Sequence, residues 1–375
     1  MTDAEALIIG AGPAGCAAAI MLARAGRHVL LLERDAEARE IVCGEFLGPT
    51  AQAALARLGL DPVALGGALI PRVVVAHGSR AARATLPFAG IGLPRQVLDQ
   101  ALRQAAIAAG AQLVTATVRR IAAGRGGWTA EGATAPILLL ATGKHALRGA
   151  PPRPGAAWVG LKLHMTADAA PEVALLPFPG GYAGLQPNGT GLTLCAAFRP
   201  GALLPADAGA FLAMIAGASA HGAAMLRDAR PMWTRPLAIA GVPYGHVART
   251  TPPGLFRLGD QAAVIASFAG EGMGIALASG IMAAEAVLAG RDAATFQAAF
   301  AARAVRPIRR AGWAAAGLCR APGLATRIAG WVPPAMARVA LATRLGRLGF
   351  KDSVVHKLVL PDKGDHRSEA LSRQT

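Results

Sequence analysis

Three glycines near the start of the chain have the spacing of a turn that binds a dinucleotide. Gly10, Gly12 and Gly15 follow a short apolar run and precede a stretch rich in Ala, Leu and Met, so they lie between a predicted strand and a predicted helix. In that position Gly10 permits a tight turn, Gly12 lets the backbone approach a pyrophosphate, and Gly15 lets the helix pack close to the strand. The diphosphate would then lie at the helix N-terminus, where unpaired N–H groups and the helix dipole favour negative charge.

A carboxylate follows at the distance that ribose binding requires. Glu33 lies 18 residues after Gly15 (33 minus 15), at the end of a second apolar run. There it could accept hydrogen bonds from the adenosine ribose hydroxyls, and an acid at this point favours an unphosphorylated ribose, as in FAD or NAD. These residues alone do not separate the two cofactors, and a Gly-rich turn in an ordinary α/β protein is the alternative.

A second glycine-rich segment, more than two hundred residues later, favours FAD. An apolar run ends in Gly259-Asp260, and the loop 270–274 then begins a predicted helix. Asp260 could hydrogen-bond a ribityl hydroxyl, and the helix N-terminus could stabilise negative charge near N1 of a reduced flavin. The alternative is a helix-capping Asp beside a coincidental glycine loop. Together the two segments predict FAD bound across a discontinuous domain.

Predicted strands and helices alternate around these motifs, which indicates an α/β fold. The predicted strands are 6–9, 28–32, 73–77, 84–87, 112–116, 137–141 and 255–258, and the predicted helices are 13–25, 49–58, 95–109 and 273–288. Between 151 and 249, runs at 158–165, 173–176 and 191–198 are separated by Gly, Pro and Asn, which predicts an antiparallel sheet interrupted by a helix at 208–216. After 294 the chain is helical and basic. We therefore predict a Rossmann-type FAD-binding domain (1–70, 95–150 and 250–300), an inserted antiparallel β-sheet substrate domain (71–94 and 151–249), and C-terminal basic helices with a tail that frays (301–375).

The positive charge of the chain is concentrated at its C-terminal end. The net charge is +16, and from Arg303 to Thr375 there are 14 Lys and Arg against 4 Asp and Glu, which gives +10. These basic residues are not interleaved with aromatic ones and no nucleic-acid module is recognisable, so we expect no nucleic-acid partner. Peripheral contact with an anionic membrane is one interpretation of the basic helices, and a solvated face is the other.

Cysteine spacing and hydropathy exclude several classes of protein. Cys16, Cys43, Cys195 and Cys319 form no CxxC pair and have no His cluster beside them, so we predict neither a metal site nor a disulfide framework. No run of 18 uncharged apolar residues resembles a membrane span. The expected location is the cytoplasm, with the inner face of the membrane as a site of peripheral contact.

On these motifs the chain resembles the flavoprotein superfamily of para-hydroxybenzoate-hydroxylase-type monooxygenases and geranylgeranyl reductases. The resemblance covers roughly residues 1–300 and rests on the first β-α-β unit, Arg95-xxx-Asp99-xx-Leu102, Ala141-Thr142-Gly143 and the Gly259-Asp260 segment. It implies a flavin contact by Arg95, an adenine contact by the strand 113–118, and NADPH or NADH as the electron donor. The expected FAD contacts are Gly10, Gly12, Pro13, Ala14, Gly15, Glu33, Arg34, Gly44, Arg95, Val118, Thr142, Gly143, Asp260, Gly270, Gly272, Met273 and Gly274.

Two branches of that superfamily give two hypotheses for the reaction. The first is a monooxygenase of secondary metabolism that hydroxylates a hydrophobic aromatic or polyketide-like molecule through a flavin C4a-hydroperoxide. The alternative is geranylgeranyl-reductase-like reduction of C=C bonds in an isoprenoid or lipid, which Cys43-Gly44-Glu45 and Gly180-Gly181-Tyr182-Ala183 favour. Thr142-Gly143 departs from the Asp-Gly pair of many hydroxylases, and Gly184-Leu185-Gln186-Pro187 departs from the Trp-x-Phe-Pro element of geranylgeranyl reductases. A non-enzymatic flavin-binding protein that docks on a membrane or partner is a third interpretation.

A few side chains are candidates for the chemistry itself. Cys43 and Glu45 lie in a loop that the resemblance brings near the flavin, so both are candidate catalytic residues. Tyr182, Tyr244 and His164 fall in the predicted sheet domain and could contact substrate, although a structural role is the alternative for each.

Overall fold

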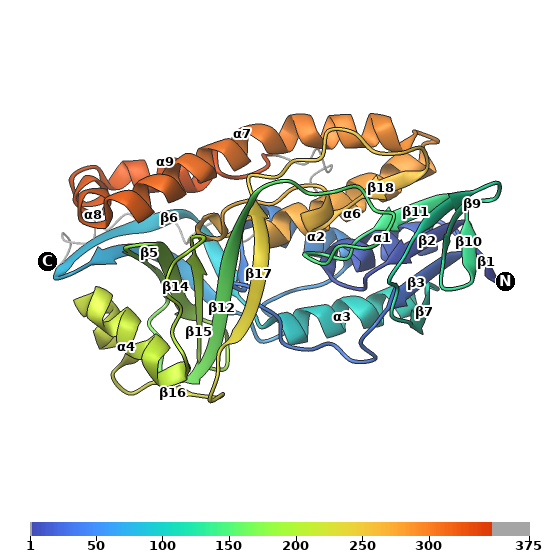
Figure 1. Cartoon of the computed structure of the whole chain (residues 1–375). Coiled ribbons are helices and arrows are strands. Elements are labelled where there is room, and N and C mark those ends of the chain that lie inside the picture. The colour runs from blue at the N-terminus through green and yellow to red at the C-terminus, as the bar shows by residue number, and fades with distance from the viewer. Residues whose placement is uncertain (1, 347–375) are drawn as a thin grey trace, which may run out of the picture.

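The first β-α-β unit forms as the sequence predicts (Figure 1). In this computed structural model, which describes residues 2–346, β2 (Ala6–Ile9) leads through the glycine turn into α1 (Pro13–Arg24) and β3 (Val29–Glu33). Every residue of β2 is buried, because a parallel strand covered by other elements on both faces exposes no side chain to water. That burial explains why its sequence is a continuous apolar run rather than an alternating one.

The half of the molecule that is predicted to bind FAD is built on a five-stranded parallel sheet. Its strand order is β18-β11-β2-β3-β7, in which β18 is Leu255–Arg257, β11 is Ile137–Leu140 and β7 is Gln112–Thr115. On one face α1 packs against α6 (Gly272–Leu288), where a Cβ on Gly280 would lie 2.2 Å from the carbonyl oxygen of Ala14. The helices α2 (Pro49–Leu58) and α3 (Arg95–Ala108) pack beside α6 and α1 respectively.

The second sheet has nine strands and lies beside the first (Figure 1). Its strands are β4 (Phe46–Leu47), β5 (Ala68–His77), β6 (Arg80–Gly92), β12 (Ala156–Thr166), β13 (Glu172–Phe178), β14 (Gly181–Pro187), β15 (Leu192–Phe198), β16 (Arg230–Pro231) and β17 (Leu237–Tyr244). Neighbouring strands are antiparallel except β5 and β13, which pair in parallel because they come from two separate parts of the chain. Two helices, α4 (Ala208–Ala218) and α5 (Ala220–Leu226), are associated with this sheet.

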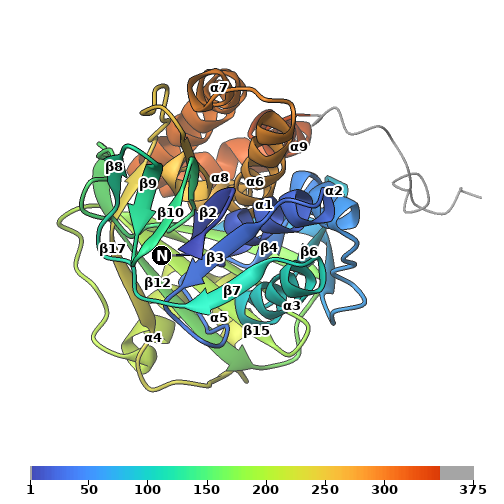
Figure 2. The ribbon, with the colours of Figure 1, turned by 90° about the vertical axis from the view of Figure 1, so that its right-hand side faces the viewer.

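Three consecutive helices run along one side of the molecule (Figures 1 and 2). They are α7 (Ala293–Arg320), α8 (Pro322–Trp331) and α9 (Pro333–Ala342), and the last two pack on the β5–β6 hairpin. Among residues 2–346, no helix is both long and apolar enough to cross a membrane.

The predicted fold class is confirmed, and the predicted elements are present with small shifts at their ends. The sequence did not predict β4, β14, β16, β17, α5 or a small sheet of β1 (Thr2–Asp3), β8 (Ala122–Gly124), β9 (Gly127–Ala130) and β10 (Ala133–Ala135). The predicted sheet was wrong in one respect, because the β5–β13 pair makes it mixed rather than wholly antiparallel. The domain boundaries stay a prediction, and the predicted tail lies outside the described residues.

Candidate functional site

The glycine turn leaves an open cradle at one glycine only. Gly10 has a φ of +102°, and a Cβ there would lie 2.5 Å from the Ala141 carbonyl oxygen. A Cβ on Gly15 would lie 1.9 Å from the carbonyl oxygen of Gly10, so this residue serves the packing of helix on strand. At Gly12 the nearest atom to a Cβ is a guanidinium nitrogen of Arg95, 3.9 Å away. The space in front of Gly12 is therefore where a diphosphate could reach the helix N-terminus.

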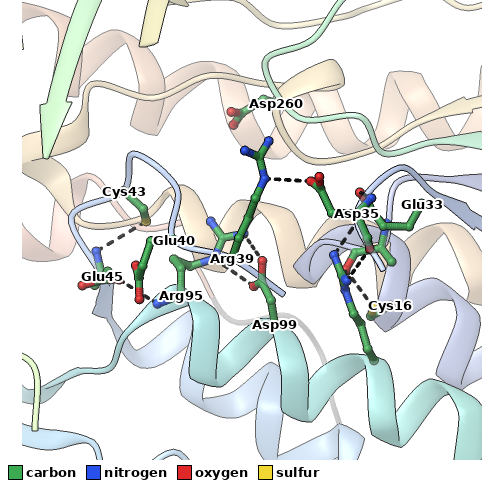
Figure 3. Close-up of polar contacts among 12 residues, drawn as sticks. Cys16, Glu33, Asp35, Arg39, Glu40, Cys43, Glu45, Arg95, Asp99 and Asp260 are labelled. Carbon is green, nitrogen blue, oxygen red and sulfur yellow. Dashed lines mark hydrogen bonds and ion pairs between the residues drawn. The ribbon is translucent and has the colours of Figure 1, made fainter. Parts of the chain in front are cut away.

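Glu33 stands at the carboxyl end of β3, at the place where a ribose-binding carboxylate belongs. Its Oε2 accepts a hydrogen bond from the N–H of Ala11 (2.7 Å) and its Oε1 accepts from the N–H of Arg34 (3.0 Å). Those bonds orient the carboxylate at the edge of the glycine turn. Beside it, Arg39 pairs with Asp35 at 2.7 Å (Figure 3).

On the facing segment, Asp260 lies in the one-turn 3-10 helix Gly259–Gln261 that follows β18. Its carboxylate is 3.3 Å from the Lys144 ammonium, in the loop that follows β11. Arg153 joins the two loops, because its guanidinium donates to the carbonyl oxygens of Gly143 (3.1 Å) and Asp260 (3.4 Å). Two segments that lie more than a hundred residues apart in sequence thus meet at one edge of the parallel sheet.

A cavity of about 1110 Å³ begins at this edge and contains most of the predicted cofactor contacts. Fifteen of the seventeen line it: Gly10, Gly12, Pro13, Ala14, Glu33, Arg34, Gly44, Arg95, Val118, Thr142, Gly143, Asp260, Gly270, Gly272 and Met273. The other two, Gly15 and Gly274, lie behind the wall, where a Cβ on Gly274 would lie 3.0 Å from Cβ of Thr50. The open cradle, the oriented carboxylate and the exposed start of α6 fit FAD.

Arg95 begins α3 and lies in the wall of the same cavity (Figure 3). Burial alone would lower the pKa of its guanidinium, but the Asp99 carboxylate outweighs burial and raises it, so the group stays charged. The two side chains form a bidentate pair with N···O distances of 2.9 and 2.8 Å. Asp99 therefore fixes the direction in which the Arg95 charge faces the cavity.

Glu45 is fully buried and accepts hydrogen bonds at both of its carboxylate oxygens. Its Oε1 accepts from the Arg95 backbone N–H and from Lys162 Nζ, both at 2.6 Å. Its Oε2 accepts from His164 Nε2 (2.7 Å) and Thr193 Oγ1 (2.6 Å). Burial would raise the pKa of Glu45, but the His164 hydrogen bond and the Lys162 charge lower it from 4.5 to about 2. An ionised carboxylate with four donors positions the loop and has no proton to give.

The same cluster has the ligand types of a metal site but already contains a cation. Glu40, Glu45 and His164 offer ligand atoms within 4.8 Å of one another. Lys162 Nζ lies between the two carboxylates, 2.5 Å from Glu40 and 2.6 Å from Glu45. The ammonium thus takes the place that a metal ion would occupy.

The structure separates the remaining candidates. Cys43 lines the cavity, and its Sγ accepts a weak hydrogen bond from the Glu45 N–H at 3.4 Å (Figure 3). Tyr182 and Tyr244 also line the cavity; the Tyr182 hydroxyl lies 3.1 Å from Ser267 Oγ, and burial raises its pKa to about 12. His164 does not line the cavity, because it stands behind Glu45 and stacks on Trp233.

The comparisons with known proteins agree with this geometry. Residues 3–120 match the family described as FAD binding domain. A menaquinone reductase from Mycolicibacterium smegmatis is 29% identical over 333 residues, which make up 77% of this chain and 77% of that protein. The chain is an FAD-binding oxidoreductase. A squalene epoxidase from Schizosaccharomyces pombe is 47% identical to this oxidoreductase, but over only 58 residues, or 16% of the chain and 13% of that protein.

Solved structures share the fold of the oxidoreductase along most of its length. A flavin-dependent brominase superposes with a TM-score of 0.73 at 19% identity, covering 93% of this chain and 96% of its own. A geranylgeranyl bacteriochlorophyll reductase-like protein from Thermoplasma acidophilum superposes with a TM-score of 0.67 at 19% identity, covering 90% and 92%. At this identity the likeness shows the fold alone, and with the family match it confirms the superfamily predicted from the motifs.

The register of the nine-stranded sheet explains why the face of the sheet that lies toward the cavity is polar in one half and apolar in the other. Side chains directly opposite each other on paired strands point to the same face. Lys162 pairs with Cys195 and His164 with Thr193, which places this polar half beneath Glu45. The apolar half lies on β5 and β13, where Val73 pairs with Val173 and Val75 with Leu175, and all four line the cavity.

Gln186 lies where these two halves meet. It pairs with Thr193 across β14 and β15, lines the cavity and is 4% exposed. Among the described residues, its side-chain Nε2 has no hydrogen-bond partner. A buried amide donor without a partner raises the free energy of the folded state by roughly 1–3 kcal/mol, which an acceptor on a ligand could recover. Four residues of the site were not predicted from the sequence: Gln186, Glu40, Lys162 and Thr193. For Lys162 there was one signal, the alternation of polar and apolar residues in β12, which places its side chain on the same face of the sheet as His164.

Beyond the flavin site, the cavity continues as an apolar arm between the sheet and the C-terminal helices. We define this arm by Val73, Val75, Leu86, Val173 and Leu175 from the sheet, and by Gly317, Leu318, Ala325, Ile328, Ala329, Met336 and Val339 from α7, α8 and α9. None of these side chains carries a polar atom. A ligand in the arm would therefore be held by dispersion and by removal of apolar surface from water.

Proposed function

We propose that the oxidoreductase reduces a carbon–carbon double bond in an extended isoprenoid-like lipid. The apolar arm is the observation that carries this proposal, because it extends from the flavin site along three helices rather than closing as a compact pocket. The side chains that define the arm offer no hydrogen-bond partners for the polar groups of an aromatic or polyketide-like substrate, although Gln186, Thr343 and Arg344 also line the cavity. The menaquinone reductase is also a relative that matches over 77% of both chains, and menaquinone carries an isoprenoid chain.

The residues of the flavin edge have separate tasks in this proposal. Gly12, Glu33 and Asp260 would hold the FAD, which when bound and reduced supplies a hydride to one carbon of the double bond. The other carbon takes a proton, for which the proposed donor is Cys43, one of two cavity-lining thiols and the one next to the charged Arg95. Glu45 and Lys162 hold that loop in place, and the amide of Gln186 would donate to an oxygen on the lipid. NADPH or NADH is the proposed source of electrons.

Oxygenation of the same kind of lipid is the second candidate. It is favoured by the strong but short match to a squalene epoxidase, an oxygenase named for an apolar isoprenoid. The hydroxylation of an aromatic molecule, predicted from the sequence as the first hypothesis, is the oxygenase reaction that the apolar arm supports least.

Single-turnover experiments distinguish the two reactions. Purified holoenzyme, reduced with dithionite without oxygen, would be mixed with a detergent-dispersed polyprenol, which has no quinone ring that reduced flavin could reduce, and the product analysed by mass spectrometry. We expect a gain of two mass units and reoxidation of one FAD per double bond reduced. Turnover only after oxygen is admitted, with a gain of sixteen mass units that becomes eighteen with oxygen-18 gas, would instead establish the oxygenase.

A further inference from the structure

The outward faces of the three C-terminal helices carry an unusual concentration of large apolar side chains. Fourteen large hydrophobic residues are exposed in the described part of the chain, and half of them lie between positions 313 and 341. Among the seven residues between 313 and 341, the most exposed are Trp331 (76%) and Trp313 (66%). The others are Leu324, Ile328, Val332, Val339 and Leu341. Exposed apolar residues scattered singly need no explanation, but a cluster of this kind marks an interaction surface.

The same faces are basic and contain no acid. Between positions 293 and 346 the sequence has eight arginines and no Asp or Glu. Seven of the arginines are exposed: Arg303, Arg306, Arg309, Arg310, Arg320, Arg327 and Arg338. The eighth, Arg344, is largely buried and pairs with Glu271. On α8, Leu324, Arg327 and Trp331 are all exposed and recur at helical spacing. On α7 the Arg309 guanidinium lies over the Trp313 ring, 5.2 Å from its centroid. We name the exposed side chains of residues 306–341 the basic apolar face.

The wall between this face and the apolar arm is one helix thick. On α8, Ala325 and Ala329 line the arm while Leu324 and Trp331 are exposed. On α9, Met336 lines the arm while Leu341 is exposed. Ile328 and Val339 line the cavity and are also 48% and 41% exposed, so the arm comes closest to the surface between α8 and α9.

We propose that the basic apolar face docks on the surface of a bilayer that contains anionic lipids, with α7, α8 and α9 lying in the plane of the interface. Tryptophan and leucine would enter the boundary between headgroups and acyl chains, and the arginines would pair with lipid phosphates. Docking in this orientation would place the arm next to the bilayer, so that a lipid substrate could pass from the bilayer into the cavity beside Ile328. That last step rests on the proposed function, whereas the docking itself does not.

The charge and the side-chain types of this face favour a bilayer over the other partners that a basic surface can bind. A nucleic acid would pair with the arginines but would leave Leu324, Val332 and Leu341 in water, since aliphatic side chains do not stack on bases. A bilayer satisfies both kinds of side chain in one geometry. The absence of acids over more than fifty residues also matches a uniformly anionic surface.

Vesicle flotation with the FAD-loaded full chain tests the docking. We expect binding to vesicles of phosphatidylglycerol and phosphatidylcholine, and little binding to pure phosphatidylcholine. Each of the changes Arg327→Gln and Arg338→Gln should weaken binding about fivefold at low salt. The double change Trp313→Ser/Trp331→Ser should weaken it by on the order of tenfold or more, with little dependence on salt. Matched controls are Leu203→Ser, at a residue that is 93% exposed, and Arg125→Gln, exposed in the turn between β8 and β9.

Three results would overturn the proposal: no binding to anionic vesicles, equal loss in the control variants, or binding to duplex DNA that is tighter and depends on the same arginines. Each variant must retain its FAD absorbance, so that misfolding is not mistaken for loss of docking. Reduction of the double bonds of a short-chain polyprenol in detergent, followed by mass spectrometry, separates this test from the proposed function. Loss of vesicle binding with normal detergent turnover overturns the docking alone, and vesicle binding without turnover overturns the reaction alone.

Discussion

Oε1 of Glu45 lies 2.6 Å from Nζ of Lys162, and neither side chain has any surface exposed to water. Each charge is stable at this depth only because the other is present. The Glu40 carboxylate accepts a second bond from Lys162, and His164, Thr193 and the Arg95 N–H donate to Glu45. The pair also holds an unfavourable backbone, since Glu45 has a φ of +59°. The contact therefore determines the shape of the loop that carries Cys43 past the flavin site.

Removing the cation should be more damaging than removing both charges. Lys162→Met would leave Glu45 and Glu40 facing each other without the ammonium, and we expect the free energy of unfolding to fall by about 3–5 kcal/mol. The double variant Glu45→Gln/Lys162→Met should lose less than Lys162→Met alone, and therefore less than the sum of the single losses. Urea unfolding of the four apoproteins measures this cycle, and strictly additive losses would contradict the coupling.

The stability of the fold should depend on pH through Glu45. Its pKa in the folded protein is about 2 against an ordinary value of 4.5, so the folded state binds the proton less tightly than the unfolded state. The stabilisation is therefore complete above about pH 4.5 and is lost as the pH falls toward 2. The gap in unfolding free energy between wild type and Glu45→Gln should shrink from pH 7 to pH 3 in urea titrations. A constant gap would show that the carboxylate is not ionised by its neighbours.

Two alanine substitutions in the glycine turn should have opposite consequences. Gly12→Ala places a methyl group in open space at an ordinary φ of −82°, so the apoprotein should fold but bind FAD at least about tenfold more weakly. Gly15→Ala places its methyl group 1.9 Å from the Gly10 carbonyl oxygen, so the fold itself should be destabilised. Flavin fluorescence titration and thermal unfolding of each apoprotein separate the effects. Normal FAD affinity in Gly12→Ala would show that the diphosphate does not bind in front of Gly12.

The thiol of Cys43 should matter to turnover and not to cofactor retention. If it delivers the proton in the proposed reduction, Cys43→Ala should lower single-turnover rates by about a hundredfold or more with FAD content unchanged. Cys195→Ala is the matched control, because Cys195 also lines the cavity but burial raises the pKa of its thiol to about 12. Equal rates in the two variants would exclude Cys43 as the proton source.

Local sequence patterns were enough to predict the residues at the edge of the parallel sheet where FAD would bind, but not the residues on the substrate side of the cavity. The glycine turn, Glu33 and Asp260 follow buried strands directly, so their places in the fold follow from the strand order of a Rossmann-type sheet. The Glu45 network could not be predicted in this way, because its members come from a loop and two strands whose pairing is set by the register of the sheet. His164 is an example: its residue type suggested substrate contact, and its register placed it behind Glu45.

The apolar arm could not be predicted from the sequence either, because Ala and Gly in a helix do not indicate whether they line a cavity or pack in a core. Ala329 on α8 lines the arm from the side opposite to the sheet. Ala329→Phe should therefore fill part of the arm and raise the KM for a long-chain lipid by about tenfold or more, while a short-chain analogue is turned over as before. Steady-state kinetics on an isoprenoid series of increasing length would check this, with Gly312→Ala, exposed on α7, as control. If the change affected every chain length equally, the arm would not be the lipid-binding site.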